Sequence, residues 1–370
     1  MKRIYNLKFF RQKEQLDMTL LILVFVFTAF GLLMIYEASN FAAFQTFSDK
    51  YRFVKDQSLW ALAGFILLFI LSRIHYRKYF QLSVPLMAVS IVTLIAVLIP
   101  GIGTKALGAR RWITLGSLNF QPSELVKLSL ILYLSAWLSS REKGRFTSFI
   151  LLLSIIVGLV VLQPDLGTAV VLTGIFLVVY FISKAPLWHF AVLMPLAVLS
   201  VLGLAVFSPY RYQRLMTFFD PNSDPLGASY HFRQILISLG SGGIKGLGLG
   251  ASRQKYQFLP EATTDSIFAI IGEEFGFIGT FALIIVYVFL LWRIFLIVRD
   301  APDKFSYLLS AGILSLLGLQ IIINLGAMVA VFPLTGIPLP FISYGGSNLI
   351  VTLCGIGMIL NISKYTKPKK

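Results

Sequence analysis

The chain has 370 residues, of which 57% are hydrophobic and only 13% are charged. Soluble proteins carry about a quarter charged residues, so this composition excludes an ordinary soluble enzyme and indicates a polytopic membrane protein. The net charge of +16 invites a nucleic-acid interpretation. Lys and Arg instead gather in short segments between apolar runs, as membrane anchors do. We therefore expect membrane lipid and no nucleic acid as a partner.

A transmembrane helix needs about 20 mainly apolar residues, and ten segments have this character. The basic N-terminus leads into the first of them without a small-residue cleavage site, which predicts a retained span. The spans that we expect are Met18–Ala38, Leu59–Ile74, Leu82–Ile99, Pro122–Leu138, Phe146–Leu162, Asp165–Ile182, Leu187–Phe207, Ser266–Val298, Phe305–Phe332 and Ile342–Ile362. The predicted fold is all-α, a single polytopic domain (residues 1–370) with ten transmembrane helices.

The loops that share a side with the N-terminus carry more Lys and Arg than the loops on the other side. This asymmetry predicts that both termini are cytoplasmic. The connection between the seventh and eighth spans, Ser208–Thr264, would then be extracytoplasmic, and it is much longer than an ordinary loop. It contains turn signals at Asp220–Pro225 and apolar runs such as Ile235–Ile237. We expect short amphipathic helices there, on or dipping into the membrane surface.

Glycines dominate the end of this loop, from Gly240 to Gly250. The run lacks the Gly-Lys-Ser/Thr triplet of a phosphate-binding loop. Two interpretations stay open. The glycines form a flexible or tightly packed re-entrant turn, or their backbone amides and Lys245 meet an anionic headgroup.

Carboxylates and cations come together just before the eighth span. Glu261 and Asp265 would share one face if the segment were helical. Carboxylates also favour helix starts for purely structural reasons. The nearby Arg253 and Lys255 favour an acid/base site at the lipid–water boundary. We expect these cations to keep Asp265 ionised, so that it can accept a proton.

Glu124 and Lys127 lie three residues apart in the fourth span, so they can pair on one face. An unpaired charge in lipid is costly, which predicts a buried pair beside a polar cavity. Arg110, Arg111 and Trp112 precede this span. They fit interface anchors, and arginine geometry equally suits a diphosphate.

Asp165, in the break between the fifth and sixth spans, fits a helix start and a functional carboxylate equally well. A proline-broken segment, Pro333–Ser347, leads into the tenth span, and such breaks are tolerated where they line a cavity. The three histidines lack zinc-ligand spacing, and the sequence shows no metal-ligand set.

Together these motifs resemble the SEDS family of shape, elongation, division and sporulation proteins, whose members are FtsW, RodA and SpoVE. The resemblance covers nearly the whole chain. It is carried by Arg111-Trp112, Phe120–Glu124, Gln163–Gly167, Leu239–Gly243, Gly246–Gly250, Leu259–Glu261 with Thr264-Asp265, Gly272–Glu274 and Pro338–Gly346. The segment Ser252–Lys255 looks more like the FtsW branch than RodA.

The resemblance implies ten transmembrane helices and a peptidoglycan glycosyltransferase in the bacterial cytoplasmic membrane. Such an enzyme polymerises lipid II, an undecaprenyl-diphosphate-linked disaccharide peptide, at the outer face, for cell division or cell shape. It also implies a class B penicillin-binding protein (a transpeptidase) as partner. A divalent cation, Mg²⁺ or Mn²⁺, is implied by the resemblance alone.

Asp265 falls on the essential aspartate of the family. The chain departs from the family pattern at two places. It has Thr263-Thr264-Asp265-Ser266 where the family usually has His-Thr-Asp-Phe, and Gly345-Gly346-Ser347-Asn348 where Gly-Gly-Ser-Ser is usual.

We therefore expect Asp265 to act as the catalytic base, with cations near the leaving diphosphate. The substrate-binding residues that we expect are Arg110, Arg111, Trp112, Glu124, Lys127, Asp165, Arg211, Arg214, Lys245, Arg253, Lys255 and Glu261. Two alternatives are a lipid II flippase and a non-catalytic scaffold for a transpeptidase. The polar residues gather at the outer face, whereas a transporter would spread them through the midplane, so the sequence favours the enzyme.

Overall fold

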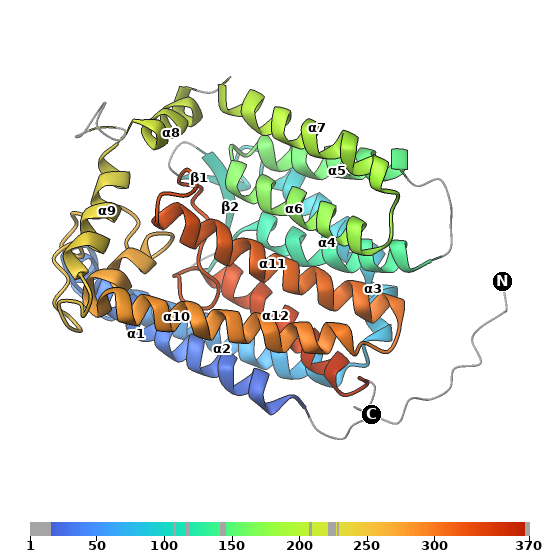
Figure 1. Ribbon diagram of the computed structural model, residues 1–370, viewed down its shortest axis with the longest axis horizontal. Helices are drawn as coiled ribbons and strands as arrows, with labels where there is room; N and C mark the ends of the chain where they lie inside the picture. The colour runs from blue at the N-terminus through green and yellow to red at the C-terminus, as the bar shows by residue number, and fades with distance from the viewer. Residues whose placement is uncertain are drawn as a thin grey trace.

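The computed structural model shows a bundle of long helices with one small sheet (Figure 1). It describes residues 16–106, 109–115, 118–140, 146–206, 209–220, 227 and 229–366. The long helices are α1 (Met18–Phe47), α2 (Arg52–Arg73), α3 (Arg77–Ala96), α4 (Pro122–Ser139), α5 (Phe146–Val161), α6 (Leu166–Ile182), α7 (Leu187–Val206), α10 (Ile267–Arg299), α11 (Lys304–Met328) and α12 (Gly346–Ser363). Two shorter helices, α8 (Pro209–Phe219) and α9 (Tyr230–Gly242), lie in the long loop.

Each predicted span coincides with most of one long helix. Six of the described helices (α1, α2, α3, α10, α11 and α12) are long and apolar enough to cross a membrane, and α5, α6 and part of α7 are shorter apolar helices. The chain is therefore a mostly helical, multi-pass membrane protein. The count of ten spans stays a prediction, as does the cytoplasmic placement of the termini.

A three-stranded antiparallel sheet, which the sequence analysis did not predict, connects α3 to α4. Its strands are β1 (Gly103–Ala106), β2 (Ala109–Leu115) and β3 (Leu118–Phe120), in the order β1-β2-β3. Strand β2 contains the Arg110-Arg111-Trp112 motif, for which the sequence left interface anchors and a diphosphate clamp as alternatives. The motif therefore lies on the central strand of the sheet, and β3 separates it from the start of α4.

Burial separates central from peripheral helices. In the most apolar window of α12, 89% of the residues are buried, whereas only 22% are buried in that of α2. The exposed residues of α2 include Leu59, Leu62 and Ile66. Apolar side chains on the outside of an apolar helix are what lipid contact requires. Helix α12 therefore lies in the core and α2 at its surface.

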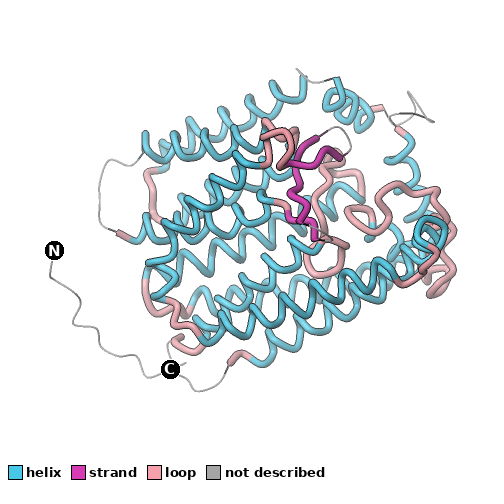
Figure 2. The backbone as a smooth tube through the Cα atoms, turned by 180° about the vertical axis from the view of Figure 1, so that it is seen from behind, coloured by secondary structure: helices cyan, strands magenta, loops and turns pink. Residues whose placement is uncertain are grey.

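Helix ends follow local capping rules. The Asp17 carboxylate accepts a hydrogen bond from the Leu20 backbone at 3.0 Å at the start of α1. Asp303 and Ser306 form a capping box at the start of α11, and Pro122 occupies the first turn of α4. Helix α1 begins, and α12 ends, at the end of the bundle opposite α8 and α9 (Figures 1 and 2).

Candidate functional site

Asp265 lies in a turn immediately before α10. The carbonyl of Glu261 accepts hydrogen bonds from the backbone N–H groups of Thr264 and Ser266, both at 3.1 Å. The Thr264 hydroxyl contacts the Glu261 carboxylate at 2.8 Å and the Asp265 carboxylate at 2.9 Å. The segment is not helical, so the condition for a shared helical face is not met. The two carboxylates are brought together by a turn and by the hydroxyl between them.

The backbone around Asp265 is held by α11 and by the segment that precedes α12. Asn324 of α11 donates from its side-chain amide to the Asp265 carbonyl at 2.9 Å and to the Ile337 carbonyl at 2.8 Å. Ser343 donates from its hydroxyl to the Thr264 carbonyl at 2.5 Å. Ser343 of the proline-broken segment thus holds the carbonyl before Asp265, and Asn324 of α11 holds the carbonyl of Asp265 itself.

The pKa of Asp265 is set by burial and by two nearby polar groups. Burial raises the pKa of Asp265, and the Thr264 hydroxyl and the Arg214 guanidinium oppose that rise. Arg214, on α8, also donates to the Leu334 carbonyl at 3.3 Å. A raised pKa makes the carboxylate a stronger base than an ordinary aspartate. Of the cations expected near Asp265, Lys255 is held instead by Glu37 and Glu274. The expectation that cations keep Asp265 ionised stays a prediction.

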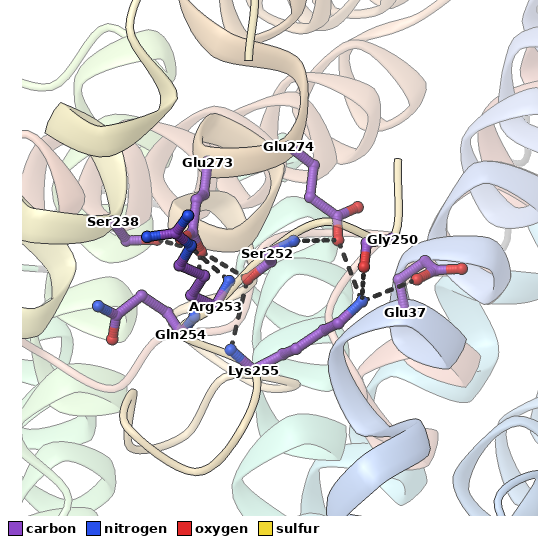
Figure 3. A network of polar contacts seen from close by, with 9 residues as sticks. All are labelled: Glu37, Ser238, Gly250, Ser252, Arg253, Gln254, Lys255, Glu273 and Glu274. Atoms are coloured by element: carbon purple, nitrogen blue, oxygen red, sulfur yellow. Dashed lines mark hydrogen bonds and ion pairs between the residues drawn. The ribbon is translucent and has the colours of Figure 1, made fainter. Parts of the chain in front are cut away.

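Lys255 is buried in an ion cluster with Glu37 and Glu274 (Figure 3). Its ammonium contacts the carboxylate of Glu37 on α1 at 3.2 Å and that of Glu274 on α10 at 3.5 Å, and it donates to the Gly250 carbonyl at 2.6 Å. A buried lysine held by two carboxylates is neutralised within the chain. Its ammonium group therefore joins the long loop to α1 and α10.

The backbone around Arg253 is also bound by a carboxylate of the chain itself. The Glu273 carboxylate accepts hydrogen bonds from the Arg253 N–H at 3.1 Å, the Gln254 N–H at 3.3 Å and the Ser252 hydroxyl at 2.5 Å (Figure 3). Successive backbone N–H groups of this kind form an anion-binding nest. Here a carboxylate of the chain itself occupies the nest. The Arg253 side chain is exposed.

The glycine run packs tightly against a break in α10, as one of the two interpretations predicted. Gly276 has φ 65° and ψ −165°, so α10 is not the continuous helix that was predicted. The carbonyls of Glu273 and Glu274 accept from Leu247 N at 3.0 Å and Gly248 N at 2.9 Å. The loop thereby satisfies carbonyls that the helix break frees, as buried backbone groups require. A Cβ on Gly246 would lie 2.1 Å from the Glu274 carbonyl oxygen, so glycine is required there. Lys245 is exposed.

Glu124 and Lys127 form the predicted pair. Their charged atoms are 2.7 Å apart, and the side chains are only 4% and 2% exposed. The second Glu124 oxygen accepts from the Asn348 side-chain amide on α12 at 2.9 Å. Asn348 is one of the departures from the family pattern, and here it completes the partners of a buried carboxylate.

Arg111 contacts the break between α5 and α6, and Asp165 lies at the end of that break. Arg111 donates to the backbone carbonyls of Gln163, at 3.0 Å, and Pro164. Asp165 caps α6, accepting from the Thr168 N–H at 3.1 Å and the Thr168 hydroxyl at 2.9 Å. These contacts favour the helix-start interpretation of Asp165. Arg110 and Trp112 are half-buried on β2. Arg211 belongs to α8, and its side chain lies outside the described residues.

The sequence analysis missed His231 as a site residue. Its Nε2 atom lies 2.8 Å from the hydroxyl of Ser266, the residue that follows Asp265. Burial and the Arg214 charge lower the pKa of His231 to about 4. Only the departure at Ser266, where a hydroxyl replaces the usual phenylalanine, signalled that this position could accept a polar partner.

The described residues contain no group of three or more His, Cys, Asp or Glu side chains that could hold a metal ion. Glu261 and Asp265, joined through Thr264, offer two carboxylates. This set does not fit a protein cage for a resident divalent cation.

The fold and the site define a multi-pass membrane protein with a polar centre at one end of a broken apolar helix. The sequence model of the FtsW, RodA and SpoVE family of cell cycle proteins matches residues 17–368. The chain belongs to this family.

Named relatives span nearly the whole chain. The stage V sporulation protein E of Bacillus subtilis is 39% identical, with 96% of this chain and 99% of that protein covered. A probable peptidoglycan glycosyltransferase FtsW of Coxiella burnetii is 41% identical, covering 92% and 94%. These relatives fit the FtsW-like assignment.

Solved structures show the same fold. A chain from a structure described as a peptidoglycan synthase complex coordinating polymerization and crosslinking is 32% identical, with a TM-score of 0.77, covering 95% of this chain and 98% of that one. The rod shape determining protein RodA of Thermus thermophilus is 31% identical, with a TM-score of 0.71, covering 96% and 99%.

Proposed function

We propose that this chain is a peptidoglycan glycosyltransferase that polymerises lipid II at the outer face of the cytoplasmic membrane. The names of the FtsW relatives state this activity for those proteins. The observation that carries the proposal here is the placement of Asp265. It lies in a turn at the start of an apolar helix, its main chain is fastened by Asn324 and Ser343, and burial raises its pKa.

The proposed reaction joins two lipid-linked glycans. A sugar 4-hydroxyl attacks the anomeric carbon of a glycan carried on a lipid diphosphate. The new carbon–oxygen bond forms as the bond to the diphosphate breaks, and the leaving diphosphate takes the electron pair. Asp265 accepts the proton of the attacking hydroxyl. Burial suits this role because it raises the proton affinity of the carboxylate.

Arg214 is the cation that acts electrostatically on Asp265. We assign it to the anionic part of the substrate, because a guanidinium suits diphosphate oxygens. Lys245 and Arg253 expose their side chains on the same loop and remain candidates for the diphosphate. Lys255 and Arg111 are less suited, since each is engaged by groups of the chain itself.

A class B penicillin-binding protein is the partner that we propose. The similarity to a chain of a peptidoglycan synthase complex supports it. A lipid II flippase would need polar residues along a path through the bundle, for which Glu124, Lys127 and Asp165 are the candidates. Their internal contacts do not favour it.

The test is polymer formation by purified protein supplied with lipid II, with and without the transpeptidase. Asp265→Asn keeps size and hydrogen bonding but removes the base, and we expect polymer yield to fall about 10²–10⁴-fold. Glu261→Gln should lose less. The matched control is Asp49→Asn, the same change at an aspartate that pairs with Lys55 at the surface. Normal polymerisation by a well-folded Asp265→Asn protein would remove Asp265 from the mechanism.

A divalent cation remains part of the proposal through the family resemblance. It would arrive with the diphosphate, because Mg²⁺ is commonly bound by one or two carboxylates plus substrate phosphates. A chelator added to the same assay should then lower polymer yield, and excess Mg²⁺ or Mn²⁺ should restore it. Unchanged polymer yield in chelator would exclude the cation.

A further inference from the structure

One face of α9 lies along the first half of α10. His231, Ile235, Ser238 and Gly242 recur at the spacing that places residues on one helical face. The Ser238 hydroxyl donates to the Ala269 carbonyl at 2.9 Å. A Cβ on Gly242 would approach the Gly272 carbonyl to 2.0 Å. The face is therefore in contact with α10 along its length, and His231 occupies the end nearest Asp265.

The Ser266 hydroxyl is used in an unusual way. Serine at the position before a helix normally accepts a hydrogen bond from a backbone N–H of the first turn. Ser266 makes no such side-chain cap. It is completely buried, and its hydroxyl lies instead 2.8 Å from His231 Nε2. The side chain thus joins α9 to the start of α10.

Three consecutive residues are therefore held by hydrogen bonds from different parts of the fold. Ser343 holds the Thr264 carbonyl, and Asn324 holds the Asp265 carbonyl. His231 holds the Ser266 hydroxyl from the opposite direction in the sequence, 35 residues earlier. Asp265 lies between these contacts. The contact at Ser266 is supplied by α9, the helix of the long loop that packs on the start of α10.

The low pKa of His231 means that its ring contacts Ser266 in the neutral form. Its pKa is lowered to about 4, mainly by burial and further by Arg214, while Glu261 acts in the opposite sense. The imidazole is therefore neutral near pH 7. A neutral ring holds the hydroxyl without placing a second positive charge near the arginine and the carboxylate.

We propose that His231 is a positioning residue for Asp265, which it orients by holding Ser266 at the start of α10. This proposal depends on the proposed function only for the tests that measure turnover. A displacement of about 1 Å at a reacting group can cost about 10²-fold in rate. Loss of the contact should therefore lower kcat and leave KM nearly unchanged, since His231 is not assigned to the substrate.

The experiment compares four variants of the full chain in detergent. His231→Leu and Ser266→Ala each remove the contact, and we expect kcat for polymerisation to fall roughly 10- to 100-fold in both. The double variant should lose no more than the worse single variant, because both remove one interaction. His231→Gln can place an amide near the Nε2 position and should restore most of the rate.

The matched control is His189→Leu, which removes another buried imidazole–hydroxyl contact, 2.6 Å from Tyr180 Oη. It should leave kcat unchanged. If His231→Leu does not fold, Ser266→Ala deletes a single oxygen and still decides the matter. Additive losses, or full activity in both single variants, would overturn the proposal.

A second readout does not depend on activity. Backbone amide hydrogen exchange across residues 264–270, measured without substrate, should speed up in His231→Leu and Ser266→Ala and return toward wild type in His231→Gln. Unchanged exchange in both contact-removing variants contradicts the positioning role. If the wild type makes no polymer but exchange responds as expected, the proposed function fails while the positioning of Asp265 stands.

Discussion

The side-chain amide of Asn348 donates a 2.9 Å hydrogen bond to the Glu124 carboxylate, whose other oxygen accepts the Lys127 ammonium at 2.7 Å. The contact joins α12 to α4 in the buried core. Partners at both oxygens are what a buried carboxylate requires. The contact combines two separate sequence features. One is a charge pair at helical spacing, and the other is an asparagine where the family usually has serine.

The first prediction concerns this buried pair. Glu124→Gln or Lys127→Met alone should destabilise the protein by about 3–5 kcal/mol, because each leaves the other charge buried without its partner. The double variant should cost clearly less than the sum of the two. Thermal unfolding in detergent, monitored by circular dichroism, measures all three. Strictly additive effects would show that the charges do not interact.

Local spacing explains which parts of the site could be predicted. Glu124 and Lys127 are three residues apart on one helix, so their contact follows from helix geometry alone. The apolar spans follow from hydropathy for the same local reason. The Lys255–Glu37 contact joins residues 218 positions apart. No periodic pattern in the sequence indicates such a pairing.

The segment around Asp265 shows a second limit. Spacing of four residues placed Glu261 and Asp265 on one helical face, but the chain forms a turn there and α10 begins only at Ile267. Glu261 has φ 51°, in the left-handed region that side chains rarely adopt. Contacts from Ser343 and Asn324 hold Thr264 and Asp265, the residues that follow in this turn. Tertiary contacts thus override the local preference, and backbone strain of this kind gathers at functional sites.

The second prediction uses two glycines of α9 that differ in surroundings. Gly242→Ala should destabilise by about 1–3 kcal/mol, because its Cβ would meet the Gly272 carbonyl at 2.0 Å. Gly240→Ala is the control, since nothing lies within 4 Å of its Cβ. It should be neutral or stabilising by up to about 1 kcal/mol through helix propensity. Equal thermal stabilities for the two variants would contradict the close packing of α9 on α10.

A third prediction concerns orientation in the membrane. Single cysteines are introduced into a Cys354→Ser background, which removes the chain's one native thiol. Lys245→Cys, in the exposed glycine run, should react with an impermeant thiol reagent added outside intact cells. Lys78→Cys, exposed at the start of α3, should react only after the membrane is opened. The reverse pattern would invert the topology.

The last prediction follows from the pKa of His231. In the folded protein it is lowered from 6.5 to about 4, so between these pH values the unfolded chain binds more protons at this residue than the folded one. The free energy of unfolding contributed by this group is therefore lost as pH falls from about 6.5 toward 4. His231→Gln does not titrate there, and its stability should fall less over the same window. The measurement is the difference in Tm between the two proteins in one detergent at several pH values, which cancels the groups that they share. We expect that difference to shift in favour of His231→Gln as the pH is lowered. A difference that stays constant from pH 7 to pH 4 would mean that His231 titrates normally, and would place it outside the buried contact with Ser266.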